Sequence, residues 1–280
     1  MSNSKDFSSY TSGSEDYTQG AAVSANHVWA TSAGDDKGSL WRFDRQTLDY
    51  QDENHDILDG PFTDPETLPN DRNKAQTAHY HDGYLYFFCR APQIHLVDPD
   101  TLEYADQSWY EVIPESEFTD DFRLFEGICR YDGDAFEEPK WFFNDRANND
   151  DSDRAVYRTD DSFNYEGRYI LNDANPSLEG EHDGYDGIEL WDEDNSTYMA
   201  GSITASQPGH PGLDIFELDS DSFNFLGTVT LDGDPDKTPD EGFQIGSLGE
   251  VYAGVRHPDG DNSTSRRPVV LEMDWTDLIN

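Results

Sequence analysis

The 280-residue sequence predicts an all-β repeat protein, and three observations support this. Residues 76–106 read as four short strands separated by turns. A unit of the same order recurs four more times along the chain. The second strand of every copy carries an aromatic residue, namely Trp29, Tyr86, Trp141, Tyr198 and Tyr252.

The unit from Gln76 to Asp106 shows the four strands most clearly. They are expected at Gln76–His81, Tyr84–Cys89, Ile94–Val97 and Leu102–Tyr104. Asp82-Gly83 lies between the first two, and an Asp-Gly pair between such runs is the strongest short hairpin signal. The Pro and Asp residues of Asp98-Pro99-Asp100-Thr101 favour a turn before the fourth strand.

The other copies are recognised by how their first strands open and how their third strands end. The openings are Gln19, Gln76, Glu126, Asp186 and Glu241, so the successive spacings are 57, 50, 60 and 55 residues. The third strands end on Asp44, Asp98, Asp160, Asp219 and Asp274. In four copies a fourth strand is expected next, as in Thr47–Tyr50 and Ser162–Tyr165.

Four antiparallel strands repeated five times are typical of a β-propeller, whose radially packed sheets leave only short edges. We therefore expect one domain, residues 1–280, that forms a five-bladed propeller. The expected blades are 19–50, 76–106, 126–170, 186–231 and 241–280. Residues 5–12 are expected to close the ring as the outer strand that the fifth blade lacks; the alternative is that residues 1–17 form a polar tail.

The composition predicts an aromatic core and an extremely acidic surface. Aromatic residues make up 13% of the chain, although all hydrophobic residues make up only 34%. Sixty acidic and 18 basic residues give a net charge of −42. Such self-repulsion opposes compaction unless concentrated salt screens it, and the acid-rich, lysine-poor composition resembles that of haloarchaeal proteins.

The charge and the apolar pattern exclude several partners and locations. A basic footprint for the phosphate backbone is absent overall, so nucleic acid is not expected as a partner. Residues 1–20 contain no apolar run and no later stretch is long enough to span a bilayer, so we expect neither a signal peptide nor membrane insertion. Cys89 and Cys129 lack the spacing of a metal or redox pair and are expected to be buried free thiols.

The long connections predict which rim of the propeller is elaborated. Those from fourth to first strands and most of those from second to third strands are long, and both sets emerge on one rim, where function tends to lie. Cations and aromatic rings gather there, and the predicted ligand-binding residues are Arg72, Lys74, Arg90, Trp109, Tyr110, Arg146, Arg256, His257, Arg266 and Arg267. Such a rim suits an acidic glycan or a carboxylate-bearing partner. The alternative is that each arginine pairs with a neighbouring acid.

The five openings surround the central channel, because the first strand of a propeller blade is innermost. Phe125-Glu126-Gly127 resembles the general-acid position of five-bladed glycosidases of the arabinanase and levansucrase type. That resemblance implies carboxylates at the first two openings as well, but here they are Gln19 and Gln76, and hydrolysis requires two carboxyl groups. The catalytic set is therefore incomplete. His79 and His81 also face the channel or its mouth in this interpretation.

The oxygen-bearing side chains of the openings suit a hard cation. Gln19, Gln76, Glu126, Asp186 and Glu241 together favour Ca²⁺ or Mg²⁺, and the alternative is a water-filled polar channel. The glycines that follow four of the openings, such as Gly127, let the inner strands approach one another near the axis.

These observations favour a non-catalytic binding or structural propeller of a halophile or its virus. Its expected partners are a cell-surface glycan or glycoprotein, or other virion proteins, and a homo-oligomer remains open. The expected location is a virion or an extracellular surface reached without a signal peptide, with the cytoplasm as the alternative. The alternative function is a glycoside hydrolase or a metal-dependent lactonase or phosphatase that uses Glu126, Asp186 and Glu241.

Overall fold

The computed structural model is an all-β propeller built from antiparallel sheets. It describes residues 18–32, 38–55, 57, 75–89, 92–117, 124–146, 155–171, 185, 187–193, 195–202, 212–219, 222–230, 238–245, 250–256 and 273–274. Within these residues there is one short 3₁₀ helix, η1 (Glu115–Glu117), and no helix long and apolar enough to cross a membrane.

Four sheets have four strands each and a fifth has three, always in sequence order. The first is β1 (Thr18–Val23), β2 (His27–Ser32), β3 (Ser39–Asp44) and β4 (Tyr50–Asn54). The second is β5 (Ala75–His81), β6 (Tyr84–Cys89), β7 (Gln93–Val97) and β8 (Tyr104–Trp109). The third is β9 (Leu124–Tyr131), β10 (Lys140–Arg146), β11 (Ala155–Asp160) and β12 (Tyr165–Ile170). The fourth is β13 (Gly187–Glu193), β14 (Ser196–Ser202), β15 (Gly212–Asp219) and β16 (Ser222–Thr230), and the last is β17 (Thr238–Ile245), β18 (Glu250–Arg256) and β19 (Met273–Asp274).

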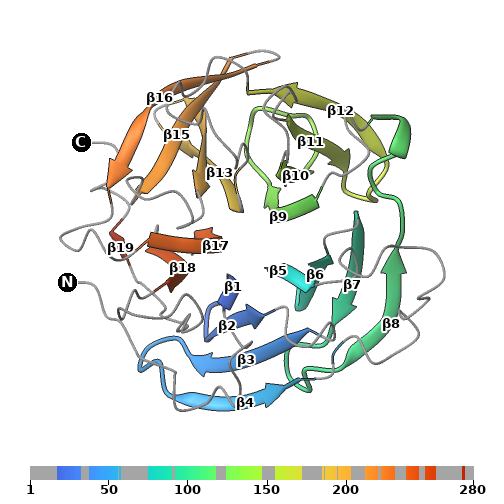
Figure 1. Cartoon of the computed structure of the whole chain (residues 1–280), viewed down its shortest axis with the longest axis vertical. Helices are drawn as coiled ribbons and strands as arrows, with labels where there is room; N and C mark the ends of the chain where they lie inside the picture. Colours follow the sequence, from blue (N-terminus) through green and yellow to red (C-terminus); the bar gives the residue numbers. More distant parts are fainter. Residues whose placement is uncertain are drawn as a thin grey trace, which may run out of the picture.

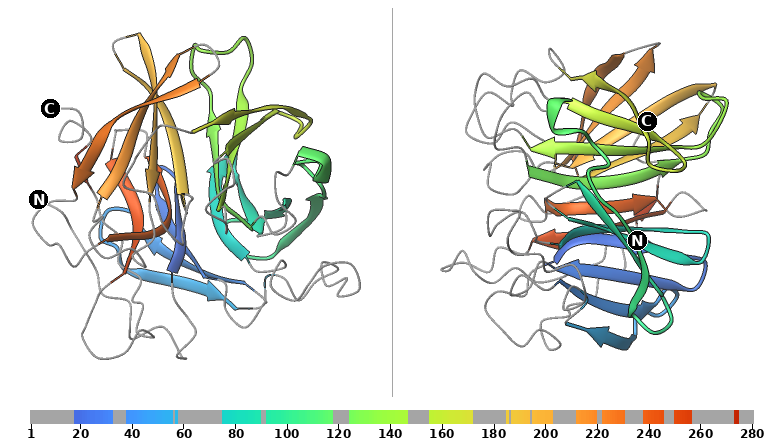
Figure 2. Two further views of the ribbon diagram at one scale, coloured as in Figure 1. Left: turned by 45° about the horizontal axis from the view of Figure 1, so that its top comes forward. Right: turned by 90° about the vertical axis from the view of Figure 1, so that its right-hand side faces the viewer.

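The first strand of every sheet lies at the centre of the ring (Figure 1). β1 contacts β5 and β17, β9 contacts β5 and β13, and β13 contacts β17, so the inner strands form a closed circle. The strands run across the thickness of the ring in the side view (Figure 2). β4, β8, β12 and β16 form its outer edge.

The expectation of five four-stranded blades holds for four of them. The last repeat forms a three-stranded sheet in the described residues, and its third strand, β19, has only two residues. The proposed closing strand, residues 5–12, lies outside the described residues. The sequence pattern was incomplete at the same place, because no fourth-strand motif follows Asp274 before the chain reaches Asn280.

In the first three sheets the turn after the third strand makes the fourth strand begin two or three residues later than predicted, whereas β16 begins at Ser222 as predicted. Asp98 Oδ1 accepts hydrogen bonds from the N–H groups of Asp100 (2.8 Å) and Thr101 (3.0 Å), which forms an Asx turn. Leu102 then takes a left-handed conformation with φ 56° and is buried. β8 consequently begins at Tyr104, two residues later than predicted. Leu48 and Phe163 occupy the same left-handed, buried position in their sheets.

The core consists of aromatic clusters between neighbouring sheets, as the composition predicted. Its largest fully buried side chains include Trp29, Trp41, Trp141 and Tyr157. Each aromatic side chain of this kind buries roughly 150–250 Å². Burial of apolar surface stabilises a fold by about 25 cal/mol per Å². Radial packing therefore derives its stability from rings held between sheets rather than from one central core.

Both cysteines lie in these clusters as free buried thiols, which confirms the prediction. Burial raises the pKa of Cys89 to about 12 and that of Cys129 well above its ordinary value. Both side chains therefore stay protonated and act as small apolar groups.

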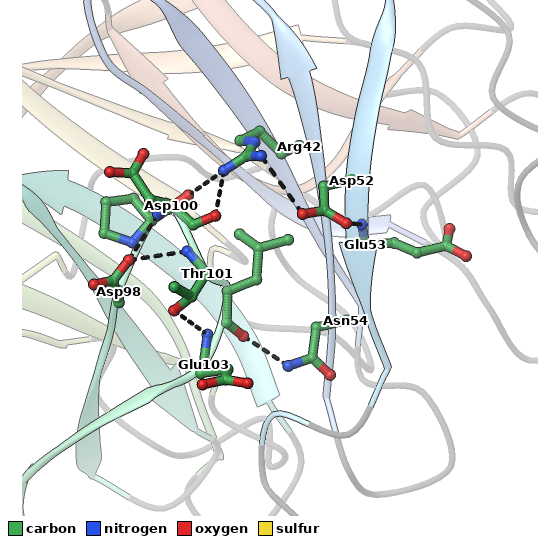
Figure 3. A network of polar contacts seen from close by, with 10 residues as sticks. Arg42, Asp52, Glu53, Asn54, Asp98, Asp100, Thr101 and Glu103 are labelled. Carbon is green, nitrogen blue, oxygen red and sulfur yellow. Dashed lines mark hydrogen bonds and ion pairs between the residues drawn. The ribbon is translucent and has the colours of Figure 1, made fainter.

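The first and second sheets are joined at their outer parts by Arg42 of β3 (Figure 3). Its Nη1 donates to the carbonyl oxygens of Pro99 (3.0 Å) and Asp100 (2.7 Å) in the neighbouring turn, and its Nη2 lies 3.5 Å from Asp52 Oδ2. Asn54 Nδ2 donates to Leu102 O at 2.7 Å. The Asx turn therefore also serves as the contact between the two sheets.

We predict that Asp98→Ala lowers the free energy of unfolding by about 0.5–1 kcal/mol at neutral pH, because two backbone donors lose a charged acceptor. These bonds lower the pKa of Asp98 below its ordinary value. The contribution of the Asp98 carboxylate to the free energy of unfolding is thus fully present above about pH 4. It is lost as the pH falls through the pKa of Asp98 in the folded protein. Urea unfolding in constant molar salt, across pH, measures the difference from wild type.

Asp100→Ala is the matched control, since its side chain takes no part in the two turn bonds. A difference for Asp98→Ala that persists unchanged at pH 2 would contradict the role assigned to its carboxylate.

Candidate functional site

The inner strands share a β-bulge where they open. The pairing of β1 with β2 shifts between Thr18 and Gly20, that of β5 with β6 shifts between Ala75 and Thr77, and that of β9 with β10 shifts at Glu126. The extra residues are thus Gln19, Gln76 and Glu126. The three residues that the sequence comparison treated as equivalent therefore occupy the same place in their sheets. A β-bulge at that place changes the direction in which the local side chains point.

The glycine beside the opening allows neighbouring inner strands to approach closely, as predicted. A Cβ atom at Gly127 would lie 2.9 Å from the Cα of Gly187 on β13. A Cβ at Gly20 would collide with the side chain of Thr77 on β5. Larger residues here would force the inner strands apart.

A polar network crosses the centre of the ring three residues after these openings along the inner strands. Gln244 of β17 accepts hydrogen bonds through Oε1 from the N–H of Val23 on β1 (2.8 Å) and from that of Tyr80 on β5 (3.3 Å). Its Nε2 lies 3.2 Å from His79 Nε2 and donates to Tyr80 O at 3.3 Å. One amide thereby connects three inner strands.

His79 extends the network to a fourth inner strand. Because the amide nitrogen of Gln244 can only donate, His79 Nε2 accepts, and the imidazole proton is assigned to Nδ1. Nδ1 lies 3.9 Å from Oε2 of Glu189 on β13. His79, Glu189 and Gln244 are 5%, 4% and 6% exposed, so all three side chains are buried at this level of the ring. We call these three residues the axial network.

Burial determines the charge state of His79. Burial, together with the smaller effects of the nearby charges of His81 and Arg130, lowers its pKa to about 3. The imidazole packs edge-on against Trp141 with ring centroids 5.6 Å apart. His79 is therefore a neutral, packed side chain over most of the pH range.

His81 lies at the end of β5 and is separate from the axial network. Arg130 Nη1 lies 3.4 Å from His81 Nδ1, Arg130 pairs with Asp161 (2.9 Å) and with Asp132, and its guanidinium sits 5.8 Å from the Trp141 ring. Both imidazoles pack edge-on against Trp141, but His79 contacts Gln244 whereas His81 contacts Arg130. Among the described side chains, no group of three or more His, Cys, Asp or Glu is arranged to hold a metal ion.

The described part of the predicted cation site is Glu126 alone. Its side chain is 1% exposed. Gln19, Gln76 and Glu241 lie in β1, β5 and β17, but their side chains are not among the described ones, and Asp186 lies outside the described residues. The pairing of β17 with β18 is also irregular between Pro239 and Phe243, around Glu241.

Two residues of the predicted rim have described side chains, Trp109 and Tyr110. Trp109 is partly buried between the second and third sheets, with its ring 4.7 Å from Phe163 and 6.1 Å from Tyr86. Tyr110 is 55% exposed beside His95. Arg146 and Arg256 end β10 and β18 with side chains that are not described, and Arg72, Lys74, Arg90, His257, Arg266 and Arg267 lie outside the described residues.

Sequence reasoning missed Glu189 and Gln244, although a signal for them was present. Both lie three residues after the opening of their repeat, and so does His79. The same position holds Ala22 and Cys129 in the other two repeats. One position of the repeat thus supplies the whole axial network, with small side chains in the two remaining sheets.

Comparison with solved structures supports the propeller fold. No protein-family model and no curated protein sequence matches the chain. A glutaminyl cyclase of Myxococcus xanthus matches with a TM-score of 0.52 and 12% identity, over 93% of this chain and 90% of that one. A GH43_12 protein from a capybara gut metagenome matches with a TM-score of 0.56 and 10% identity, over 94% of this chain and 54% of that one. The chain thus spans about half of the second protein's length, and at these identities the likeness concerns the fold.

We predict that Gln244→Leu lowers the free energy of unfolding by about 2–4 kcal/mol, because two buried N–H groups lose their acceptor. Gln107→Leu, at an exposed position of β8, should change it by no more than about 0.5 kcal/mol. Urea denaturation in constant molar salt compares the two. Equal small effects would show that the amide does not hold the inner strands together.

We also predict that His79 remains neutral in the folded protein at pH 5. The unfolded chain binds this proton below about pH 6.5, whereas the fold binds it only near pH 3, so acidification through that window favours unfolding through this residue. Nitrogen-15 NMR of the imidazole, assigned by comparison with His79→Gln, reports the charge state. An imidazolium signal at pH 5 would contradict the burial of the ring.

Proposed function

We propose that this chain is a non-catalytic binding propeller that works in concentrated salt. The observation that carries the proposal is the burial of the axial network: His79 lies 3.2 Å from Gln244 and 3.9 Å from Glu189, and all three side chains are buried. A ligand would then meet the loops on the rim rather than the channel at this level. Rim loops on a rigid scaffold are the usual place for recognition.

The proposed ligand is an acidic glycan or another carboxylate-bearing partner. The cations of the described body are already engaged with protein groups: Arg130 with Asp161, and Lys140 and Arg158 with Glu166. Recognition would therefore rest on the rim cations, among them Arg266 and Arg267, and on Tyr110, whose exposed ring offers a stacking surface.

The proposed setting is the surface of a halophile or of its virus, with a virion or cell-surface location. The net charge of −42 supports it, because molar salt limits the repulsion between so many charges to short distances. In the same proposal the three-stranded sheet is the fifth blade, residues 5–12 complete it, and Ca²⁺ or Mg²⁺ binds at the five openings.

A second candidate is a propeller enzyme, a glycoside hydrolase or a metal-dependent lactonase or phosphatase. The observation that favours it is the repeated bulge at Gln19, Gln76 and Glu126, because bulges are often found next to active sites. Glu126, Asp186 and Glu241 would supply the carboxylates.

Binding of the purified protein in molar salt, to acidic glycans and to intact halophile cells, tests the first candidate. We expect the wild type to bind and Arg266→Ala/Arg267→Ala to bind at least about tenfold more weakly. Arg45→Ala, which removes a cation from the turn between β3 and β4, should bind normally.

Glu126→Gln distinguishes the two candidates. It should leave binding unchanged if the rim is the site. Absence of binding, together with hydrolysis of a glycoside or lactone that Glu126→Gln abolishes, would replace the binding function with the enzymatic one.

A further inference from the structure

The outer strand of the fourth sheet differs from the other outer strands. β16 has nine residues, whereas β4, β8 and β12 have five or six. β16 contains no charged residue, whereas β4 carries Asp52 and Glu53, β8 carries Asp106, and β12 carries Glu166 and Arg168. Short length and charge are the usual protections of a sheet edge. Among the outer strands of the four complete sheets, β16 alone lacks both.

The repeat supplies an internal control for the centre of this strand. The pairing of each outer strand is irregular near its middle, and the extra residue is Gln51 in β4, Glu166 in β12 and Leu226 in β16. The equivalent position is thus polar in the first and third sheets and apolar in the fourth. Leu226 is 55% exposed. Packing within the sheet therefore does not account for a leucine here.

The two sides of β16 have different surroundings. Phe223 is buried and Phe225 partly buried in the cluster between the third and fourth sheets. Ser222 and Asn224 are exposed on the other side, and Leu226, the bulge residue, is exposed as well. Beyond the bulge Thr228 returns to the side of Phe225, where its Oγ1 donates to Asp214 Oδ1 at 2.5 Å. The exposed residues of β16 thus form an uncharged strip along the strand itself, with one large apolar side chain at its middle, on a protein of net charge −42.

We propose that two copies of this chain associate through the outer edge of β16, with Leu226 at the centre of the contact. Two copies carrying 42 excess negative charges each repel one another wherever acids face acids, and this strip removes that repulsion locally. An antiparallel strand meets itself across a two-fold axis, so one surface provides both halves of the interface. Molar salt screens the remaining charge and leaves the apolar contact intact.

The bulge limits how the two strands meet. Backbone pairing can occupy the residues on either side of Leu226 but not the bulge itself. The leucine then supplies apolar burial at the axis, and the flanking N–H and C=O groups of the edge supply hydrogen bonds. A charged residue at position 226 would place two like charges face to face.

Sedimentation equilibrium in molar salt over a range of protein concentrations tests the proposal. We expect the wild type to dimerise and Leu226→Glu, which introduces the residue of the third sheet, to raise the dimer Kd at least about tenfold. Gln51→Glu is the matched control, because it adds the same charge at the equivalent exposed position of the first sheet. It should dimerise like the wild type.

A wild type that stays monomeric at every concentration, or a Leu226→Glu variant that dimerises as well as Gln51→Glu, would overturn the proposal. Binding of a different protein at this edge, with the wild type monomeric, would overturn it equally. Near-ultraviolet circular dichroism of both variants checks that the fold is retained, which is expected because both side chains are exposed.

Discussion

The structure depends on how the inner strands are held at the centre of the ring. There the side chain of Thr77 on β5 packs against Gly20 of β1, and the backbone of β13 approaches Gly127 of β9, so that neither glycine position admits a side chain. Gln244 then bonds to backbone groups of two other inner strands. An amide suits this position because it supplies donors and acceptors without a charge that would have to be desolvated. The radial order of the outer strands follows from this fixed centre.

Farther from the axis, neighbouring sheets are joined by polar contacts between a side chain and a turn, together with packed rings. Arg42 bonds to two carbonyl oxygens of the second sheet, and Arg168 bonds to the carbonyl oxygen of Glu117. Tyr131 donates to Asp192 across the third and fourth sheets at 2.5 Å. Contacts to neutral backbone groups depend less on ionic strength than exposed ion pairs do, which suits a chain that we propose to work in concentrated salt.

Tertiary contacts and strand pairings added to or corrected the sequence interpretation. Trp109 was expected to contact a ligand, and the structure adds that its ring packs against Phe163 and Tyr86 of two neighbouring sheets. The aromatic residues of the second strands share one pairing position in the first, second and last sheets, because each pairs with the third residue after the opening of its own repeat. The pairs are Trp29 with Ala22, Tyr86 with His79 and Tyr252 with Gln244. In the third sheet the equivalent residue is Phe142 rather than Trp141, because that hairpin has a longer turn.

The sequence alone determined the repeat, the hairpin at Asp82-Gly83, the buried thiols and the opening residues, because each depends on local turn chemistry or on a pattern repeated along the chain. The third residue after an opening also supplies each member of the axial network, but the sequence alone could not assign that position a role. His79, Gln244 and Glu189 are 55 to 165 residues apart, and only closure of the ring brings them together. Tertiary structure likewise decided that Leu226 is exposed, because its exposure depends on how neighbouring sheets pack and not on its own segment.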